Sequence, residues 1–183
     1  MKIIAGKHKG RKLASLPGKT TRPTSGKVRE AIFSIVADRI EDAAVVDLFA
    51  GTGAFGLEAI SRGASHAVFV DSDRKGIEII RKNIAACGEN ERSTVLLADI
   101  AGGLRRLSLS GEEFDLVFMD PPYNRQAVRP ALENLASSGI LIHGAVIAIE
   151  HDKNEKIPED IAGIEVTDRR KYGKTLVTFM KRM

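Results

Sequence analysis

Residues 45–56 read VVDLFAGTGAFG, a run of apolar residues that leads into a glycine-rich turn. Gly51, Gly53 and Gly56 have the spacing G-x-G-x-x-G, in which the glycines permit a tight turn, a close approach by a ligand and close packing of the following helix. Asp71 follows Gly51 by 20 residues, at the end of the next apolar run, where a carboxylate can accept both hydroxyls of an adenosine ribose. The pattern predicts a strand, a ligand-binding turn and a helix. A plain tight turn beside a solvated aspartate is the alternative.

Beyond this turn, short apolar runs alternate with amphipathic stretches along the chain. Such alternation predicts an α/β fold in which a largely parallel sheet is covered by helices on both faces. Residues 163–182 look like two strands joined near Tyr172 and Gly173, so we expect a mixed, seven-stranded sheet whose last strand is antiparallel. The other expected strands are 44–49, 66–71, 94–99, 114–119 and 145–151, and the expected helices are 27–40, 55–62, 74–87, 101–109 and 125–138.

Length and composition suit one compact domain, because 183 residues with 43% hydrophobic content can bury a single core. The lone Cys87 excludes an internal disulfide, and we find no signal peptide and no apolar run long enough to span a bilayer. We therefore expect a cytoplasmic monomer that does not engage a membrane.

Positive charge is concentrated at the N-terminal end, where residues 1–29 contain nine Lys or Arg and no Asp or Glu. Nucleic acid is the simplest partner for such an end, because each neutralised phosphate releases counterions; a solvated or disordered tail is the alternative. Apolar residues on both sides of GKHKG predict a β-hairpin with a basic turn. We expect one globular unit, with residues 1–40 as a basic extension of hairpin and helix and residues 41–183 as the core domain.

A second basic cluster, RRKYGK, occupies residues 169–174. It can contact phosphate and stack a base, or it can be the polar tip of an ordinary hairpin, and both interpretations stay open. The residues expected to bind RNA at the two ends are Lys7, Lys9, Arg11, Lys12, Arg29, Arg170, Lys171 and Lys174.

The glycine turn fits both NAD and S-adenosylmethionine, and two aspartates favour the second. Asp47 lies in the strand just below the turn, where its carboxylate would repel a pyrophosphate but suits the ammonium and sulfonium of S-adenosylmethionine. Asp99, at the end of the third strand, can accept the N6 amine of adenine while Ile100 packs on the ring. A helix N-cap is the alternative for Asp99.

The sequence DPPY, residues 120–123, follows the strand expected at 114–119. Proline has no N–H and holds the preceding residue in an extended conformation, so carbonyls here remain free to accept hydrogen bonds. The Asp120 carboxylate and a carbonyl near Pro121 match the two N–H donors of an exocyclic base amine and would stabilise the positive charge that develops on its nitrogen. Tyr123 offers a flat face for a base swung out of its stack. A strand-ending turn is the alternative.

The segments KIIAGKHKGRKL, RPTSGKVREAIFSI, VVDLFAGTGAFGLEAISRGA, VFVDSD, DPPY and YGKT, in this order, resemble the bacterial RsmD-type methyltransferases over nearly the whole chain. The resemblance implies a Rossmann-like class I methyltransferase fold that moves a methyl group from S-adenosylmethionine to the N2 amine of a guanine in 16S rRNA, within a small-subunit assembly particle, leaving S-adenosylhomocysteine. An adenine-N6 or other exocyclic-amine methyltransferase and a non-catalytic RNA-binding protein with a retained cofactor pocket are the alternatives.

The resemblance also assigns residues to the site. It places Asp47, Gly51 and Gly53 at the methionine end of the cofactor, Asp71 at its ribose and Asp99 at its adenine. We expect no metal, because the four histidines have no metal-ligand spacing with each other or with Cys87. The full expected set is Asp120, Pro121, Pro122 and Tyr123 for catalysis, and Arg22, Thr24, Asp47, Phe49, Gly51, Gly53, Asp71, Ser72, Asp99 and Ile100 for the cofactor.

Overall fold

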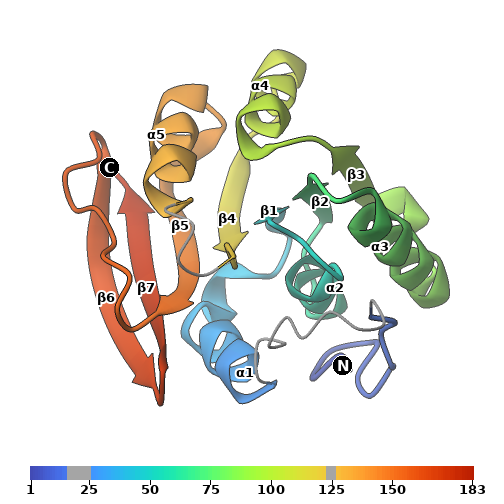
Figure 1. Cartoon of the computed structure of the whole chain (residues 1–183). Helices are drawn as coiled ribbons and strands as arrows, with labels where there is room; N and C mark the ends of the chain where they lie inside the picture. Colours follow the sequence, from blue (N-terminus) through green and yellow to red (C-terminus); the bar gives the residue numbers. More distant parts are fainter. Residues whose placement is uncertain (16–25, 123–126) are drawn as a thin grey trace.

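A computed structural model describes residues 1–15, 26–122 and 127–183. Seven strands of the described residues form one sheet with the order β3-β2-β1-β4-β5-β7-β6 (Figure 1). The first five strands in chain order are mutually parallel, and β7 is antiparallel to both of its neighbours. The strands are β1 Ala44–Leu48, β2 His66–Asp71, β3 Ser93–Leu97, β4 Phe114–Met119, β5 Leu141–Asp152, β6 Ile164–Tyr172 and β7 Thr175–Arg182.

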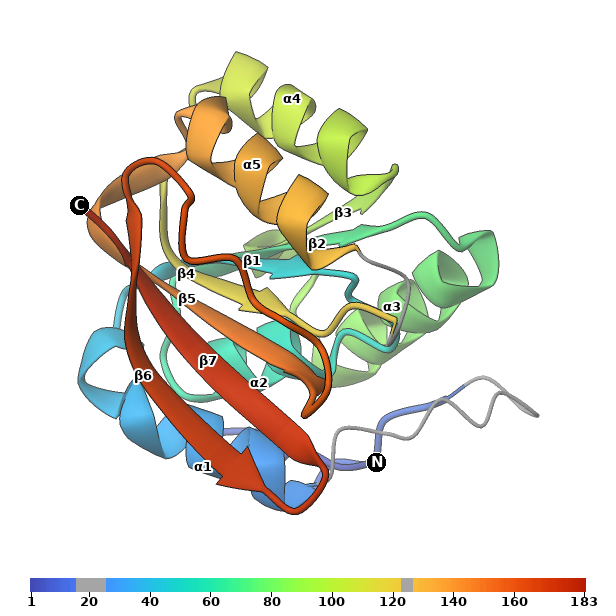
Figure 2. The same cartoon turned by 60° about the vertical axis from the view of Figure 1, so that its left-hand side comes forward.

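Helices cover both faces of the sheet (Figures 1 and 2). Three of them pack on one face and two on the other, which the composition of the two buried apolar clusters also shows. The helices are α1 Gly26–Ile35, α2 Ala54–Ser61 and α3 Arg74–Cys87 on the first face, and α4 Ile100–Ser110 and α5 Val128–Ser138 on the second, with short 3-10 helices η1 Ala37–Arg39 and η2 Asn90–Arg92.

The two cores follow from the alternation of side chains along each strand. In β1, Val45 packs with α1, α2 and α3, whereas its neighbour Val46 packs with α4 and α5. Both residues are fully buried, because a parallel strand covered on both faces has no solvent side. Asp47 points to the same face as Val45, which places a carboxylate inside the first core.

Both ends of α3 follow the capping rules. Asp73 begins α3, where its carboxylate accepts the backbone N–H of Lys75 at 3.0 Å, and Gly88 ends the helix in the left-handed conformation. These two residues explain why α3 has the bounds that the sequence predicts. The strands β2 and β4 also have their predicted bounds. None of the helices that the structure describes is long and apolar enough to cross a membrane.

The expected class I methyltransferase fold, with its mixed sheet and antiparallel last strand, is confirmed. The expected N-terminal β-hairpin is present in a short form. Residues 1–15 fold back on themselves around an antiparallel bridge between Lys2 and Lys12. On either side of this bridge, the backbone N–H groups of Ile3 and Leu13 donate to the carbonyls of Arg11 and Met1, each at 3.0 Å. Ile3 and Leu13 of this segment are also buried in the first core, so tertiary contacts fix the short hairpin to the rest of the protein.

Candidate functional site

Three aspartates gather at the carboxyl ends of β1, β2 and β4. Leu48, the last residue of β1, pairs with Val70 on one side and with Met119 on the other. Asp71 and Asp120 each come one residue later, so they flank the end of β1 from its two neighbours. Parallel strands place their carboxyl ends at one edge of the sheet, where α/β folds bind their ligands.

Asp47 is the buried member of this group, with 1% of its surface exposed. Its Oδ2 accepts the backbone N–H of Gly56, in the first turn of α2, at 2.9 Å. Burial raises the pKa of Asp47 well above its ordinary value, although the hydrogen bond from Gly56 opposes this. The negative charges of Asp120 and Asp71 raise the same pKa further. A positively charged group bound at this edge would relieve the repulsion among the three carboxylates.

The turn between β1 and α2 has a shape that requires glycine at three positions. Gly51 and Gly53 have φ values of 57° and 76°, in the left-handed region that side chains disfavour. Gly56 needs the absence of a side chain for another reason, because a Cβ there would overlap the Phe69 ring. Phe49 also has a positive φ, of 60°, which is a strained conformation for a bulky residue and is often found at functional sites.

The Asp71 carboxylate is half-buried and already holds the turn. Its Oδ2 accepts the backbone N–H of Gly51 at 2.7 Å, and its Oδ1 accepts the N–H of Asp73 at 2.8 Å. Each carboxylate oxygen has a second lone pair, so a ribose hydroxyl can still be accommodated. Ser72 between these two aspartates is exposed.

Asp99 is exposed and caps α4, because its Oδ1 accepts the backbone N–H of Gly102 at 2.7 Å. The N-cap alternative therefore describes the structure, and an additional contact with adenine stays a prediction. Ile100 is half-buried and packs against the second core.

The described part of DPPY comes directly after β4. Asp120 is half-buried, Pro121 is buried and Pro122 is exposed, so the segment leads from the core to the surface beside the three carboxylates. The expectations for Tyr123, Arg22 and Thr24 lie outside the described residues.

Residues 1–15 are tied to α2 and α3 by buried polar side chains that the sequence analysis did not single out. Glu58 of α2 has no exposed surface, and its two carboxylate oxygens accept the backbone N–H groups of Ile4 and Ala5 at 2.8 and 3.0 Å. Ser61, one turn later, donates to the Ala5 carbonyl at 2.6 Å. Both residues fall on the buried side of an otherwise apolar helix, which is the signal that could have identified them.

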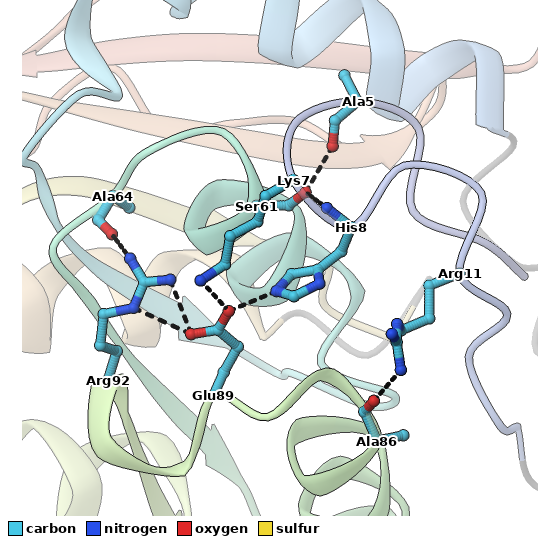
Figure 3. A network of polar contacts seen from close by, with 9 residues as sticks. All are labelled: Ala5, Lys7, His8, Arg11, Ser61, Ala64, Ala86, Glu89 and Arg92. Atoms are coloured by element: carbon cyan, nitrogen blue, oxygen red, sulfur yellow. Dashed lines mark hydrogen bonds and ion pairs between the residues drawn. The ribbon is translucent and has the colours of Figure 1, made fainter.

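Glu89, just after α3, is the second anchor (Figure 3). It is 3% exposed, and Lys7 Nζ lies 2.6 Å from its Oε1, which also contacts His8 Nε2. Arg92 approaches the other oxygen, with Nη2 to Oε2 at 2.7 Å. Burial alone would raise the pKa of Glu89, but the hydrogen bonds from Lys7, His8 and Arg92 outweigh this effect and lower the pKa to about 2.

The predicted RNA-binding residues of the N-terminal end differ in their exposure. Lys9 and Lys12 are exposed, and Lys7 remains 53% exposed although it pairs with Glu89. Arg11 is also exposed, and its guanidinium donates to the Ala86 carbonyl at the end of α3 (Figure 3).

Arg29 is a correction, because it cannot form part of a basic surface. It is 1% exposed, donates to the Lys2 carbonyl and lies 3.7 Å from the Glu58 carboxylate. Burial lowers its pKa, which the nearby charge of Glu58 partly offsets. The expectation that Arg29 contacts RNA is therefore wrong; this side chain fixes α1 to α2 and to the N-terminal segment.

The C-terminal basic cluster lies at the tip of the β6–β7 hairpin. This tip is at the same end of the molecule as the N-terminal segment in both views (Figures 1 and 2). Lys171 and Lys174 are exposed, whereas the Arg170 guanidinium pairs with Asp168 at 2.7 Å. Nothing here separates the two interpretations of this cluster, so its contact with RNA stays a prediction.

A cavity of about 420 Å³ opens at the opposite edge of the sheet, where β1, β4 and β5 begin. Arg39, Asp115, His143 and Lys181 contribute to its lining, together with further residues of both charges. It contains none of the predicted site residues. No cluster of His, Cys, Asp or Glu that could hold a metal ion was found among residues 1–15, 26–122 and 127–183.

Comparison with known proteins supplies independent information. The family model described as Conserved hypothetical protein 95 matches residues 1–181. The chain is 34% identical over 182 residues to "Putative rRNA methyltransferase YlbH" of Bacillus subtilis, in an alignment that covers 100% of this chain and 99% of that protein. It is 34% identical over 158 residues to "Ribosomal RNA small subunit methyltransferase D" of Escherichia coli, in an alignment that covers 86% of this chain and 78% of that protein. The solved structure "Putative methyltransferase yhhF from Escherichia coli" is 30% identical, with a TM-score of 0.86 over 100% of this chain and 97% of that one.

Proposed function

The chain belongs to the Conserved hypothetical protein 95 family, and from this premise we propose that it is an S-adenosylmethionine-dependent methyltransferase that acts on ribosomal RNA. We further propose that its target is the exocyclic N2 amine of a guanine in 16S rRNA. The names of the two sequence relatives, an rRNA methyltransferase and a small-subunit rRNA methyltransferase, support this substrate class.

The observation that carries the proposal is the group of three carboxylates beside the glycine turn. Asp47 lies in β1 just below the turn, and Asp71 lies beside the turn at the end of β2. Asp120 follows β4, the other neighbour of β1, and is close enough to Asp47 to raise its pKa. A cofactor with an ammonium and a sulfonium fits such a site, whereas a pyrophosphate would be repelled. The glycine backbone at Gly51 and Gly53 allows a ligand to approach closely.

Residues of this chain would share the work of binding. Asp71 would accept the ribose hydroxyls, Asp99 the adenine amine, and Asp47 would balance the charge of the methionine end. Phe49, Gly51, Gly53, Ser72 and Ile100 would line the same cofactor site. S-adenosylmethionine supplies an electrophilic methyl group carried on a positively charged sulfur.

Asp120 would act on the acceptor. An exocyclic amine is a poor nucleophile, because its lone pair is delocalised into the base. The Asp120 carboxylate, together with a main-chain carbonyl near Pro121, would accept the amine hydrogens and direct the nitrogen lone pair toward the methyl group. The same carboxylate would stabilise the positive charge that develops on nitrogen, and no metal is required for this displacement.

Recognition of RNA would rest on Lys7, Lys9, Arg11 and Lys12 of the N-terminal segment, with Lys171 and Lys174 on the hairpin tip. We propose that residues 1–40 serve as the RNA-contacting extension and residues 41–183 as the catalytic domain of one globular unit. The protein would work as a cytoplasmic monomer on a small-subunit assembly particle, and shape recognition of a looped-out base would replace groove readout.

Transfer of a labelled methyl group tests the proposal. Wild-type protein and labelled S-adenosylmethionine are incubated with small subunits and with naked 16S rRNA, both from cells that lack the gene, and the modified nucleoside is identified by mass. We expect N2-methylguanosine. N6-methyladenosine as the product would establish the adenine alternative, and cofactor binding without transfer to either RNA would favour the non-catalytic one.

Asp120→Asn examines the catalytic assignment. The variant should bind the cofactor as the wild type does and lose at least about 100-fold in transfer rate, as is typical when a group that stabilises developing charge is removed. Asp38→Asn makes the same chemical change at an exposed site in η1 and should transfer at the wild-type rate. Equal rates for both variants would remove Asp120 from the mechanism.

A further inference from the structure

One face of α3 packs against the glycine turn. Gly76, Ile80 and Asn83 are spaced i, i+4 and i+7, so they lie in a row along the helix. A Cβ on Gly76 would lie 3.4 Å from the Gly51 carbonyl oxygen, and Ile80 Cγ2 lies 3.4 Å from the position of a Cβ on Gly53. Gly76 and Ile80 therefore lie directly against the two left-handed glycines of the turn, Gly51 and Gly53.

Asn83, the third residue of the row, bonds to two separate segments. Its Nδ2 donates to the carbonyl of Thr52, inside the glycine turn, at 2.9 Å. The same nitrogen donates to the Ala14 carbonyl at 3.1 Å, and Oδ1 accepts the Ala14 N–H at 2.7 Å. Asn83 is 1% exposed.

The arrangement uses both amide hydrogens and the amide oxygen of Asn83. The reverse orientation of the amide would point its oxygen at two carbonyl oxygens, so the hydrogen bonds fix the side chain in one position. If one of these partners moved away, a buried polar group would be left without a hydrogen bond, which is unfavourable. The Thr52 carbonyl and the Ala14 backbone are thus held at a fixed separation, and a shift of either segment is resisted by the other.

We propose that Asn83 is a positioning residue that couples the basic N-terminal segment to the cofactor turn, so that RNA bound to residues 1–15 tightens the binding of the cofactor. RNA bound to the segment would hold Ala14 against Asn83, and Asn83 would hold the turn at Thr52. By linkage, bound cofactor tightens RNA binding by the same factor. This inference rests on the proposed function, and it assigns a residue that touches neither the cofactor nor the reacting amine.

The test is the affinity for S-adenosylhomocysteine, measured by calorimetry with and without saturating unmethylated 16S rRNA at one salt concentration. This ligand carries no transferable methyl group, so the RNA stays unmodified during the titration. We expect RNA to tighten binding by about 5-fold or more in the wild type, the lower range of typical allosteric coupling. In Asn83→Ala the affinity with RNA divided by the affinity without RNA should fall to about 1, because that variant no longer links the two segments.

Asn83→Asp separates the two sides of the link. Its carboxylate can still accept the Ala14 N–H but cannot donate to the carbonyls of Thr52 and Ala14. The variant therefore keeps one bond to the N-terminal segment and none to the turn, so it should lose the coupling while Glu58 and Glu89 keep the segment docked. Asn134→Ala is the matched control, because Asn134 makes a similar amide-to-carbonyl bond to Pro130 on α5, across the sheet. Thermal unfolding of each variant shows that it is folded at the temperature of titration.

The outcomes are distinct. Loss of the coupling in both Asn83 variants, with the coupling retained in Asn134→Ala, supports the assignment. The assignment of Asn83 is overturned if RNA does not change the affinity of the wild type for S-adenosylhomocysteine. It is also overturned if Asn83→Ala is folded and keeps the wild-type coupling. Either result leaves the proposed function intact. A wild type that binds no S-adenosylhomocysteine under either condition overturns the proposed function, and the coupling with it.

Discussion

The Asp71 carboxylate accepts the backbone N–H of Gly51 at 2.7 Å, although 20 residues and a whole helix separate them in the chain. The bond joins the end of β2 to the turn that leaves β1. A single carboxylate thus helps to fix the shape of the glycine turn, and we propose that the same carboxylate binds the ribose of the cofactor. Its removal should therefore affect the cofactor twice, through a lost contact and through a loosened turn.

Asp71→Asn should weaken the binding of S-adenosylhomocysteine by about 10- to 100-fold, because hydrogen bonds to a charged group are worth about 1.5–3 kcal/mol. The amide also offers only one acceptor oxygen, so the N–H of Gly51 or of Asp73 loses its partner. Isothermal calorimetry on the RNA-free protein measures the effect. Glu78→Gln, on the exposed side of α3, is the control and should bind as the wild type does. Wild-type affinity in Asp71→Asn would contradict the role of Asp71.

Gly56→Ala should destabilise the protein, because the new methyl group would overlap the Phe69 ring under α2. Overpacking of this kind costs about 1–3 kcal/mol of unfolding free energy. Gly26→Ala is the control, since a Cβ on Gly26 meets no atom of the described residues within 4 Å and alanine favours a helix. Urea denaturation compares the two.

A second substitution tests the cause of that loss. Phe69→Leu in the Gly56→Ala background makes room for the methyl group, so the double variant should be more stable than the sum of the single effects. Simple additivity of the two changes would show that the clash is not the reason.

Local patterns predicted the elements that are bounded by polar residues, and they missed what tertiary contacts decide. The bounds of α3 follow from Asp73 and Gly88, which lie next to it in the chain. The burial of Arg29 has no local signal, because its partners are the Lys2 carbonyl and Glu58. A count of positive charges therefore assigned Arg29 to a surface that it does not reach.

The candidate site shows the same division. The strand ends identified Asp47, Asp71 and Asp120 as neighbours, because parallel strands bring their carboxyl ends together. No local pattern indicates that Asp71 accepts a hydrogen bond from Gly51, or that Asn83 joins Thr52 to Ala14. Those bonds depend on how α3 sits against the sheet and on where the N-terminal segment docks.

The stability of the protein should depend on pH through Glu89. The pKa of this carboxylate is lowered from 4.5 to about 2 in the folded protein, so the folded state binds the proton less readily than the unfolded chain. The stabilisation is therefore fully present above pH 4.5 and is lost as the pH falls toward 2.

Glu89→Gln removes this dependence. Between about pH 5 and pH 3 the unfolding free energy of the wild type should fall more steeply than that of the variant, by up to about 1.4 kcal/mol per pH unit. Glu91→Gln, an exposed neighbour in η2, should keep the wild-type slope. Parallel curves for wild type and Glu89→Gln in urea denaturation would contradict the assignment.

The exposed lysines of the N-terminal segment should contribute to RNA binding through phosphate contacts. A variant with both Lys9→Ala and Lys12→Ala should bind 16S rRNA more weakly, and the slope of log affinity against log salt should decrease by about 1.4–1.8, since each phosphate contact contributes about 0.7–0.9. Filter binding at several salt concentrations gives the slope. Arg105→Ala with Arg106→Ala removes the same charge from exposed positions on α4, which covers the other face of the sheet (Figure 1), and should leave the slope unchanged. Equal losses in the two double variants would mean that net charge, and not the N-terminal segment, binds the RNA.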